Sequence, residues 1–285
     1  MHFSMLVLKT KKELRDELIK IDASVDIGLV PTMGALHLGH VSLIRKAVSQ
    51  NQYVVVSIFV NPTQFNNVED LEKYPKTLDN DVHLISSISD QILIFAPSVS
   101  EIYPTKIIHK NYEFVGLDKV MEGEFRANHF NGVATIVEEL FKLIQPSRAY
   151  FGEKDFQQLR IIQKLVEIQK IPVEVIGCEI VREDHGLAMS SRNERLSATI
   201  RQKAGFVYET LKTAKEKFGM ESATSIKDWV SKKFQENENL KLEYFEIADV
   251  ETLTPSKKKI DNTKYRAFIA VYAEQVRLID NIALN

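Results

Sequence analysis

Short apolar runs rich in β-branched residues alternate with amphipathic helical patterns over roughly the first 178 residues of the chain. The strand-like runs are residues 27–30, 53–60, 91–95, 148–151 and 173–176. The helical stretches are residues 41–50, 77–87, 130–144 and 155–169, with Thr77 and Asp155 as candidate N-caps. This alternation predicts βαβ units and a parallel sheet with helices on both faces. Because ligands of such sheets bind at the carboxyl ends of the strands, a site is expected in the loops after Val30, Val60 and Phe151.

The pattern changes after about residue 178, where the alternation of strands and helices stops. Two stretches then have the spacing of surface helices, and two alternate apolar and polar side chains as antiparallel strands do. They are residues 199–217 and 224–235 for the helices, and residues 242–250 and 266–278 for the strands. A polar, lysine-rich turn at residues 255–262 separates the two strands. We therefore expect an α/β domain over residues 1–178 and a smaller α+β domain over residues 179–285.

Charge and cysteine content narrow the class of protein. Lys and Arg total 37 and Asp and Glu total 39, which gives a net charge of −2 and no electrostatic reason to expect a nucleic-acid or membrane partner. Cys178 is the single cysteine, so no disulfide forms within the chain, as is typical of a reducing compartment. No apolar run approaches the roughly 20 residues of a membrane span, and the start lacks the order of a secretory signal. A cytoplasmic protein is expected.

The first motif is PTMGALHLGH at residues 31–40, between a predicted strand and a predicted helix. Gly34 and Gly39 allow tight turns and close approach of a ligand to the backbone. His37 and His40 are three residues apart and share one face of a helical turn, where free N–H groups favour an anion. This combination predicts a phosphate cradle. Surface histidines in a glycine-containing loop are the plainer alternative, and a zinc site lacks an evident third ligand.

The second motif is FVNPTQF at residues 59–65, where Pro62 ends the strand. Asn61 and Gln64 offer uncharged donors and acceptors beside Phe59 and Phe65. Such a mixture suits a small polar molecule that carries hydroxyl groups or a carboxylate. A turn that only ends the strand is the alternative.

Two further motifs provide cations and hydroxyl groups. In YFGEKDFQQ, residues 150–158, Lys154 supplies a compact positive charge and Gln158 falls one turn into the next helix. In residues 181–193, the run Ser190-Ser191-Arg192 combines two hydroxyl donors with a cation that can bind phosphate through two bonds. The alternatives are an ordinary helix cap with a solvated lysine and a helix-capping loop. The chain contains neither a GxxxxGK[ST] loop nor a GxGxxG fingerprint.

Taken in order, PTMGALHLGH, FVNPTQF, FGEKDFQQL and GLAMSSRN resemble the pantothenate synthetase family, over about residues 28–197 and more weakly beyond. The resemblance implies a Rossmann-like domain with the H-x-G-H element and a smaller C-terminal domain that closes over the site. It further implies a homodimer. The implied activity is the ATP-dependent condensation of (R)-pantoate with β-alanine through a pantoyl-adenylate, with Mg²⁺, in coenzyme A biosynthesis.

The resemblance also implies roles for individual residues. ATP contacts are implied at Met33, Gly34, Ala35, Leu36, His37, Leu38, Gly39, His40, Gly152, Glu153, Lys154, Asp155, Val181, Met189, Ser190, Ser191 and Arg192. The implied catalytic residues are His40, His37, Lys154 and Arg192, and the implied substrate residues are Gln64, Gln158 and Asn61. Gln64 would touch both pantoate and β-alanine. Asp81 would hold magnesium, although Asn80 replaces one residue of the family's acidic pair. The family's Arg-Pro-Gly-His-Phe is Arg126-Ala-Asn-His129-Phe130 here.

Three rival functions follow from the same motifs. A nucleotidylyltransferase acting on a phosphorylated acceptor would need a second anion site, whereas Asn61, Gln64 and Gln158 are neutral. A catalytically inactive nucleotide-binding regulator is disfavoured by the presence of both histidines, Lys154 and Arg192. A tRNA synthetase is disfavoured by the near-neutral charge.

Overall fold

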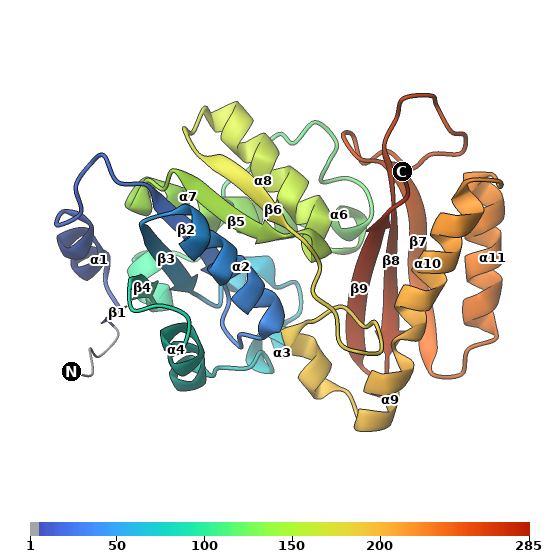
Figure 1. Cartoon of the computed structure of the whole chain (residues 1–285), viewed down its shortest axis with the longest axis horizontal. Coiled ribbons are helices and arrows are strands. Elements are labelled where there is room, and N and C mark those ends of the chain that lie inside the picture. Colours follow the sequence, from blue (N-terminus) through green and yellow to red (C-terminus); the bar gives the residue numbers. More distant parts are fainter. Residues whose placement is uncertain (1–5) are drawn as a thin grey trace.

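The structure is a computed structural model that describes residues 6–285 and contains two sheets side by side (Figure 1). The larger has six parallel strands in the order β1-β4-β3-β2-β5-β6, and the smaller has three antiparallel strands in the order β7-β8-β9. The expected combination of a Rossmann-like parallel sheet with a smaller α+β part is confirmed. No helix of residues 6–285 is both long and apolar enough to cross a membrane.

The strands of the larger sheet match the strand-like runs of the sequence, with one addition. They are β1 Val7–Leu8, β2 Ile27–Thr32, β3 Tyr53–Ile58, β4 Ile92–Phe95, β5 Arg148–Gly152 and β6 Glu174–Cys178. β1 is two residues long and pairs only with β4, so it left no periodic signal. β2 lies at the centre, between β3 and β5.

Helices cover both faces of this sheet, as the alternation predicted. The elements between its strands are α1 Lys11–Leu18, α2 Leu38–Gln50, η1 Pro62–Gln64, α3 Val68–Glu72, α4 Leu78–Ser86, α5 Val99–Ile102, α6 Glu122–Phe125, α7 His129–Ile144, η2 Glu153–Asp155 and α8 Phe156–Gln169. Successive strand residues face opposite sides. Leu29 therefore packs with α7 and α8 in one core cluster, whereas Val30 packs with α2 and α4 in another.

Three details of the predicted helices were wrong. Helix α2 starts at Leu38 rather than at residue 41, and His37 is its N-cap. Thr77 and Asp155 occupy N-cap positions, but neither side chain makes a capping hydrogen bond. The Thr77 hydroxyl instead donates to Asp81 Oδ1 over 3.3 Å.

The second sheet carries its helices on one face (Figure 1). After η3 Ser191–Arg195, its elements are α9 Ala198–Lys203, α10 Phe206–Phe218, α11 Ala223–Gln235, β7 Leu240–Asp249, β8 Tyr265–Ala273 and β9 Val276–Ala283. A core cluster distinct from those of the first sheet lies between α10, α11 and the three strands. Apolar contact also joins the two parts, since the ring of Phe156 in α8 and the ring of Phe268 in β8 have centroids 6.0 Å apart.

Two predicted elements of this part are each divided in the structure. Residues 199–217 form α9 and α10, which are separated at Gly205, where a Cβ atom would lie 2.3 Å from the His185 carbonyl oxygen. Residues 266–278 include most of β8, a turn at Glu274 and the start of β9. β8 is the central strand and is buried along most of its length, so alternation could not show where it ends.

Candidate active site

A cavity of about 220 Å³ lies at the carboxyl ends of β2, β3 and β5. The chain moves outward from β2 to β3 and β4, then returns to place β5 on the other side of β2. Parallel sheets leave a crevice for ligands at such a reversal. Among the expected site residues, those that line the cavity are Met33, His37, Gly39, His40, Gln64, Gly152, Lys154, Asp155, Gln158, Val181, Met189, Ser190, Ser191 and Arg192. The structure therefore brings all four motifs to one cavity.

His37 and His40 line the cavity as neutral imidazoles of the same tautomer. The Gly39 backbone N–H donates to His37 Nδ1 over 3.1 Å, and the His37 backbone N–H donates to His40 Nδ1 over 3.3 Å. Burial lowers the pKa of His37 to about 4 and the pKa of His40 to about 3, so both rings are neutral at pH 7. Because Nδ1 accepts in each ring, Nε2 carries the proton. Two hydrogen-bond donors therefore stand at the start of α2.

The loop that carries these histidines is held by Asp81 from α4. The Asp81 carboxylate is 2% exposed and accepts the backbone N–H groups of Ala35 over 2.9 Å and Leu36 over 2.8 Å. Gly34, with φ of 81°, gives the loop its sharp turn. The expectation that Asp81 holds magnesium does not fit this arrangement, because both of its oxygens support the loop and it lies outside the cavity lining. Gly34, Ala35 and Leu36, for which ATP contacts were expected, also lie outside the cavity lining and form the part of the loop that Asp81 supports.

Asn61 and Gln64, which were expected to act together on a substrate, have different surroundings. Asn61 is fully buried: its Nδ2 donates to the Gly132 carbonyl over 3.1 Å, and its Oδ1 accepts the Tyr103 hydroxyl over 2.8 Å. The expected substrate role of Asn61 is therefore corrected to a structural one. The Gln64 side chain lines the cavity, and its amide makes no hydrogen bond to any residue that the structure describes.

The neighbouring glutamines at the start of α8 also differ. Gln157 is buried, and its Nε2 donates to the carbonyl groups of Leu117 and Val120, both over 2.8 Å. Its Oε1 accepts the Glu122 backbone N–H over 3.0 Å. Gln158 points to the other side and lines the cavity, as the sequence predicted. Gln157 therefore holds residues 117–122 in place, and the side chain of Gln158 remains available to a ligand.

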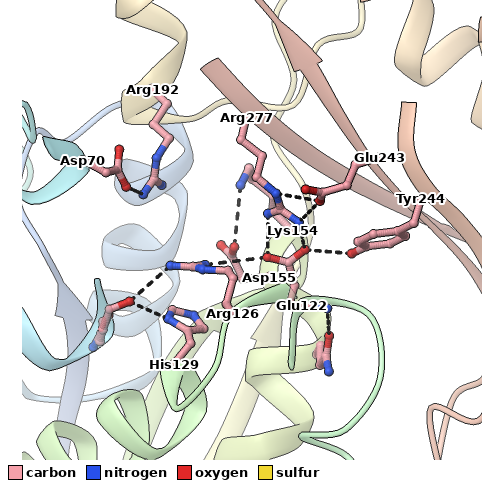
Figure 2. A network of polar contacts seen from close by, with 12 residues as sticks. Asp70, Glu122, Arg126, His129, Lys154, Asp155, Arg192, Glu243, Tyr244 and Arg277 are labelled. Carbon is pink, nitrogen blue, oxygen red and sulfur yellow. Dashed lines mark hydrogen bonds and ion pairs between the residues drawn. The ribbon is translucent and has the colours of Figure 1, made fainter. Parts of the chain in front are cut away.

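Lys154 and Arg192 bring positive charge to the cavity in different ways. The nearest carboxylate oxygen to Lys154 Nζ is that of Asp155, at 3.7 Å. Arg192 Nη2 donates to Asp70 Oδ2 over 2.8 Å (Figure 2). Arg195 Nη1 binds the other oxygen of Asp70 over 2.9 Å. Asp70, in α3, raises the pKa of Arg192 against the effect of burial. The Arg192 charge is thus held in a fixed place, whereas the ion pair that Lys154 makes within residues 6–285 is a longer one, to Asp155.

The two serines of the Ser190-Ser191-Arg192 run are used within the protein. Ser190 caps the short helix η3 by accepting the Arg192 backbone N–H over 3.3 Å. The Ser191 hydroxyl donates to the Ala35 carbonyl over 3.0 Å. This bond joins the fourth motif to the first. Of the two hydroxyl donors expected from the sequence, that of Ser191 is therefore used within the protein, whereas the Ser190 O–H can still donate to a ligand.

Several cavity residues were not among the site residues expected from the sequence. Arg126 and His129 come from the irregular segment that precedes α7 and from its first residue. His129 Nδ1 donates to the Gln64 carbonyl oxygen over 2.8 Å, and Arg126 Nη2 donates to the same oxygen over 3.3 Å. The apolar wall of the cavity is formed by Phe59, Phe65, Val133, Ile136, Val137, Leu140 and Phe151. Phe59 and Phe65 belong to the second motif, whereas the four side chains of α7 have ordinary core spacing, so only the fold distinguishes those four from core residues.

An ion-pair network connects the rim of the cavity to the second sheet (Figure 2). Both oxygens of Glu122, in α6, accept from Arg277 of β9, over 2.8 and 2.7 Å. The Tyr244 hydroxyl of β7 donates to Glu122 Oε1 over 2.8 Å, and Arg277 Nε also binds Glu243 over 2.8 Å. Burial alone would raise the pKa of Glu122, but Arg277 outweighs it and lowers that pKa to about 2.

Comparison with known proteins gives matches that extend over almost the whole chain. A pantoate-beta-alanine ligase family profile matches residues 6–283. A pantothenate synthetase of Christiangramia forsetii is 55% identical over 282 residues, which cover 99% of this chain and 100% of that protein. The crystal structure of pantothenate synthetase from Thermus thermophilus superposes with a TM-score of 0.90 at 39% identity, covering 98% of this chain and 99% of that one.

A second solved structure was determined with ligands bound. It is the pantoate-beta-alanine ligase from Francisella tularensis, complexed with beta-gamma ATP and beta-alanine. It superposes with a TM-score of 0.83 at 35% identity and covers 99% of this chain and 98% of that chain. The resemblance noted in the four motifs therefore extends to the whole fold.

Proposed function

Because the chain belongs to the pantoate–β-alanine ligase family, we propose that its central cavity performs both steps of that family's reaction. The chain is an ATP-dependent ligase that joins pantoate to β-alanine and releases AMP and diphosphate. The observation that carries the assignment to this cavity is the meeting of four loops, distant in sequence, around one space. That space combines donors for phosphate, neutral amides and an apolar wall.

In the first step, the pantoate carboxylate attacks the α-phosphorus of ATP. A carboxylate is ionised at pH 7, so no base is needed, and the barrier is one of charge and geometry. Negative charge develops on the phosphoryl oxygens and on the departing diphosphate. The Nε2–H groups of His37 and His40, the Lys154 ammonium and the Arg192 guanidinium would stabilise that charge. The N-terminus of α2 adds backbone donors.

The other side of the cavity fits pantoate. Pantoate carries a carboxylate, two hydroxyl groups and a carbon atom with two methyl groups. The apolar side chains of α7, among them Val133 and Val137, would contact the methyl groups, while the amides of Gln64 and Gln158 bind the polar groups. These four side chains carry no charge for a phosphorylated acceptor. Together with the family profile that matches residues 6–283, this disfavours the nucleotidylyltransferase alternative.

Gln158→Ala is expected to weaken pantoate binding about tenfold, because one side-chain hydrogen bond to the acid is lost. Titration of pantoate in the presence of ATP measures this effect. The matched control is Gln157→Ala, which removes three internal hydrogen bonds and should lower the melting temperature while changing pantoate affinity less. Equal pantoate affinities for Gln158→Ala and the wild type would contradict the assignment.

In the second step, the β-alanine amine attacks the carbonyl carbon of pantoyl-adenylate and AMP leaves. Water must be kept from the mixed anhydride during this step, which is the usual purpose of a closing domain. We propose that residues 179–285 form a separate domain that closes over residues 1–178. The contacts between Glu122 and Arg277 support this assignment, because they join the two parts beside the cavity.

We further propose that Mg²⁺ accompanies the ATP phosphates. Within residues 6–285, no group of three or more His, Cys, Asp or Glu side chains is placed to hold a metal ion, so phosphate oxygens and water would supply most of its ligands. Asp155 would supply a protein ligand, since it lines the cavity and its side chain is 48% exposed. Bound there, the ion would neutralise phosphate charge.

Asp81→Asn separates a structural role of Asp81 from a role in magnesium binding. The substitution is expected to raise the KM for ATP about tenfold, because the uncharged amide holds the Ala35 and Leu36 N–H groups less firmly. The Mg²⁺ concentration for half-maximal adenylation should stay the same. Separate titrations of ATP and Mg²⁺ measure the two quantities. A shift confined to the Mg²⁺ titration would reinstate Asp81 as a metal ligand.

A homodimer in the cytoplasm is the arrangement that we propose for the protein in the cell. The family resemblance supports the dimer, and sedimentation at several concentrations tests it. The cytoplasm is supported by the single cysteine, which is buried, and by the use of ATP as a substrate.

The activity is tested by incubating the protein with ATP, Mg²⁺, pantoate and β-alanine while AMP and pantothenate are measured. Pantothenate should require every component. Exchange of labelled diphosphate into ATP should require pantoate but not β-alanine, because adenylation precedes attack by the amine. Exchange that needs no pantoate, or that needs a phosphorylated acceptor, would reject the proposal.

A further inference from the structure

Arg126 is a cation at the cavity for which adenylation provides no use. It follows α6 and lines both the 220 Å³ cavity and an adjoining cavity of about 400 Å³. Lys154, Asp155, Ser190 and Arg192 line both cavities as well, so the two cavities adjoin beside the proposed phosphate-binding groups. Arg126 therefore stands where a second small substrate could approach the adenylate.

The charge of Arg126 is less compensated than that of the neighbouring arginines (Figure 2). Arg277 binds Glu122 through two bonds, and Arg192 and Arg195 share Asp70 at 2.8 and 2.9 Å.

The nearest carboxylate oxygen to Arg126 is Glu122 Oε2, at 3.7 Å, and Glu122 is already neutralised by Arg277. Within the described part of the chain, the Arg126 guanidinium makes one hydrogen bond, to the Gln64 carbonyl, out of the five N–H groups that it can donate. Burial is the main cause that lowers the pKa of Arg126, yet a guanidinium remains protonated at neutral pH. The Arg126 guanidinium is therefore a positive charge with unused N–H donors, to which an anionic ligand could bind.

The position of Arg126 is fixed relative to Gln64. Arg126 and His129 donate to the same Gln64 carbonyl oxygen, over 3.3 and 2.8 Å. Burial and the Arg126 charge lower the pKa of His129 to about 3, so this ring is neutral and does not compete for an anion. The guanidinium is therefore held next to the residue whose side chain is proposed to contact both substrates.

We propose that Arg126 binds the carboxylate of β-alanine, which enters through the 400 Å³ cavity. The proposal deepens the proposed function and rests on it. In β-alanine, two methylene groups separate the amine from the carboxylate, a span of roughly 5 Å. With the carboxylate on Arg126, the amine can lie beside Gln64, where the adenylate carbonyl is expected. A guanidinium binds a carboxylate through two parallel bonds, which orients the molecule as well as attracting it.

The test is Arg126→Gln, which retains an amide donor for the Gln64 carbonyl but removes the charge. The kcat/KM for β-alanine is expected to fall about 10–100-fold, the scale of a hydrogen-bonded charge. Diphosphate exchange that depends on pantoate, measured without β-alanine, should stay within about twofold of the wild type. Arg126→Lys, which keeps the charge without the two-bond geometry, should lie between the two.

Propylamine, in which a methyl group replaces the carboxylate, provides a second comparison. The wild type should prefer β-alanine strongly, and Arg126→Gln should lose most of that preference, because propylamine has nothing for Arg126 to bind. Arg195→Gln is the matched control: Arg195 lines only the larger cavity and is paired with Asp70, so the preference should remain.

Three outcomes would overturn the proposal. They are an unchanged kcat/KM for β-alanine in Arg126→Gln, an unchanged preference over propylamine, and a fall in exchange as large as the fall in ligation. The last would mean that Arg126 serves adenylation or the position of Gln64 instead. If the wild type itself shows no exchange that depends on pantoate, the proposed function fails first, and this proposal fails with it.

Discussion

Replacing His40 with alanine is expected to slow pantoate adenylation by about 10²–10³-fold, the scale of removing one fixed donor to transition-state charge. The ring of His40 is positioned by the His37 backbone N–H, which occupies Nδ1 and leaves the proton on Nε2. Because the pKa of His40 is lowered to about 3, the group is ready as a neutral donor over the whole physiological range. Diphosphate exchange with pantoate measures the adenylation step without the second step.

Two further substitutions of His40 separate the role of Nδ1, the acceptor, from the role of Nε2, the donor. Asparagine can place an acceptor near the position of Nδ1 and so keep the contact with the His37 N–H, but it has no donor at the position of Nε2. Glutamine can place an amide N–H near Nε2. We expect asparagine to be as slow as alanine and glutamine to recover part of the rate. Exchange at the wild-type rate in His40→Ala would remove His40 from the catalytic group.

Replacing Glu122 with alanine is expected to destabilise the protein by about 3–5 kcal/mol, the usual cost of removing one partner from a buried ion pair. The Glu122 side chain is 9% exposed and binds Arg277 and Tyr244, so its loss leaves the 18%-exposed Arg277 with Glu243 alone. Denaturant unfolding monitored by circular dichroism measures the change. Glu243→Ala is the milder control, because Arg277 keeps both of its bonds to Glu122.

The contribution of Glu122 should depend on pH in a defined window. Arg277 lowers the pKa of Glu122 from 4.5 to about 2 against the effect of burial. A group whose pKa is lower in the folded state contributes stability above its unfolded pKa and loses it as the pH falls toward the folded value. The stability difference between the wild type and Glu122→Gln should therefore be full at pH 7 and shrink between pH 4.5 and 2. A difference that is the same at pH 7 and pH 3 would contradict the assignment.

The sequence predicted the parallel sheet and the loops of the site because both depend on local signals. β-Branched runs such as residues 53–58 identify buried strands, and parallel strands must place their following loops at one edge. Gln64 and Gln158 were found because polar side chains directly follow a strand or begin a helix. The sequence could not predict the role of a polar side chain when that role depends on its hydrogen-bond partner. Asn61 resembles Gln64 in chemistry and position, but Gly132 and Tyr103 occupy its side chain.

Long-range partners explain the other differences. Asp81 lies more than forty residues from the N–H groups that it accepts, and Asp70 lies 122 residues from Arg192. No periodicity in the chain encodes such pairs. Arg126 and His129 lie at the two ends of a short irregular connection between α6 and α7. The segment that leads into α6 is held by Gln157, a buried residue from a distant part of the chain.

The buried carboxylate of Asp81 has a consequence for how the nucleotide binds. Ala35 has a φ of 50°, a left-handed conformation that costs an alanine about 1–2 kcal/mol and persists only when its surroundings impose it. Asp81 and Ser191 impose it from opposite ends of the same residue, at its N–H and its carbonyl oxygen. The entropy lost in ordering this turn therefore belongs to folding. The triphosphate therefore binds to a turn that is already ordered, and no conformational entropy of this turn is lost on binding that would weaken the affinity.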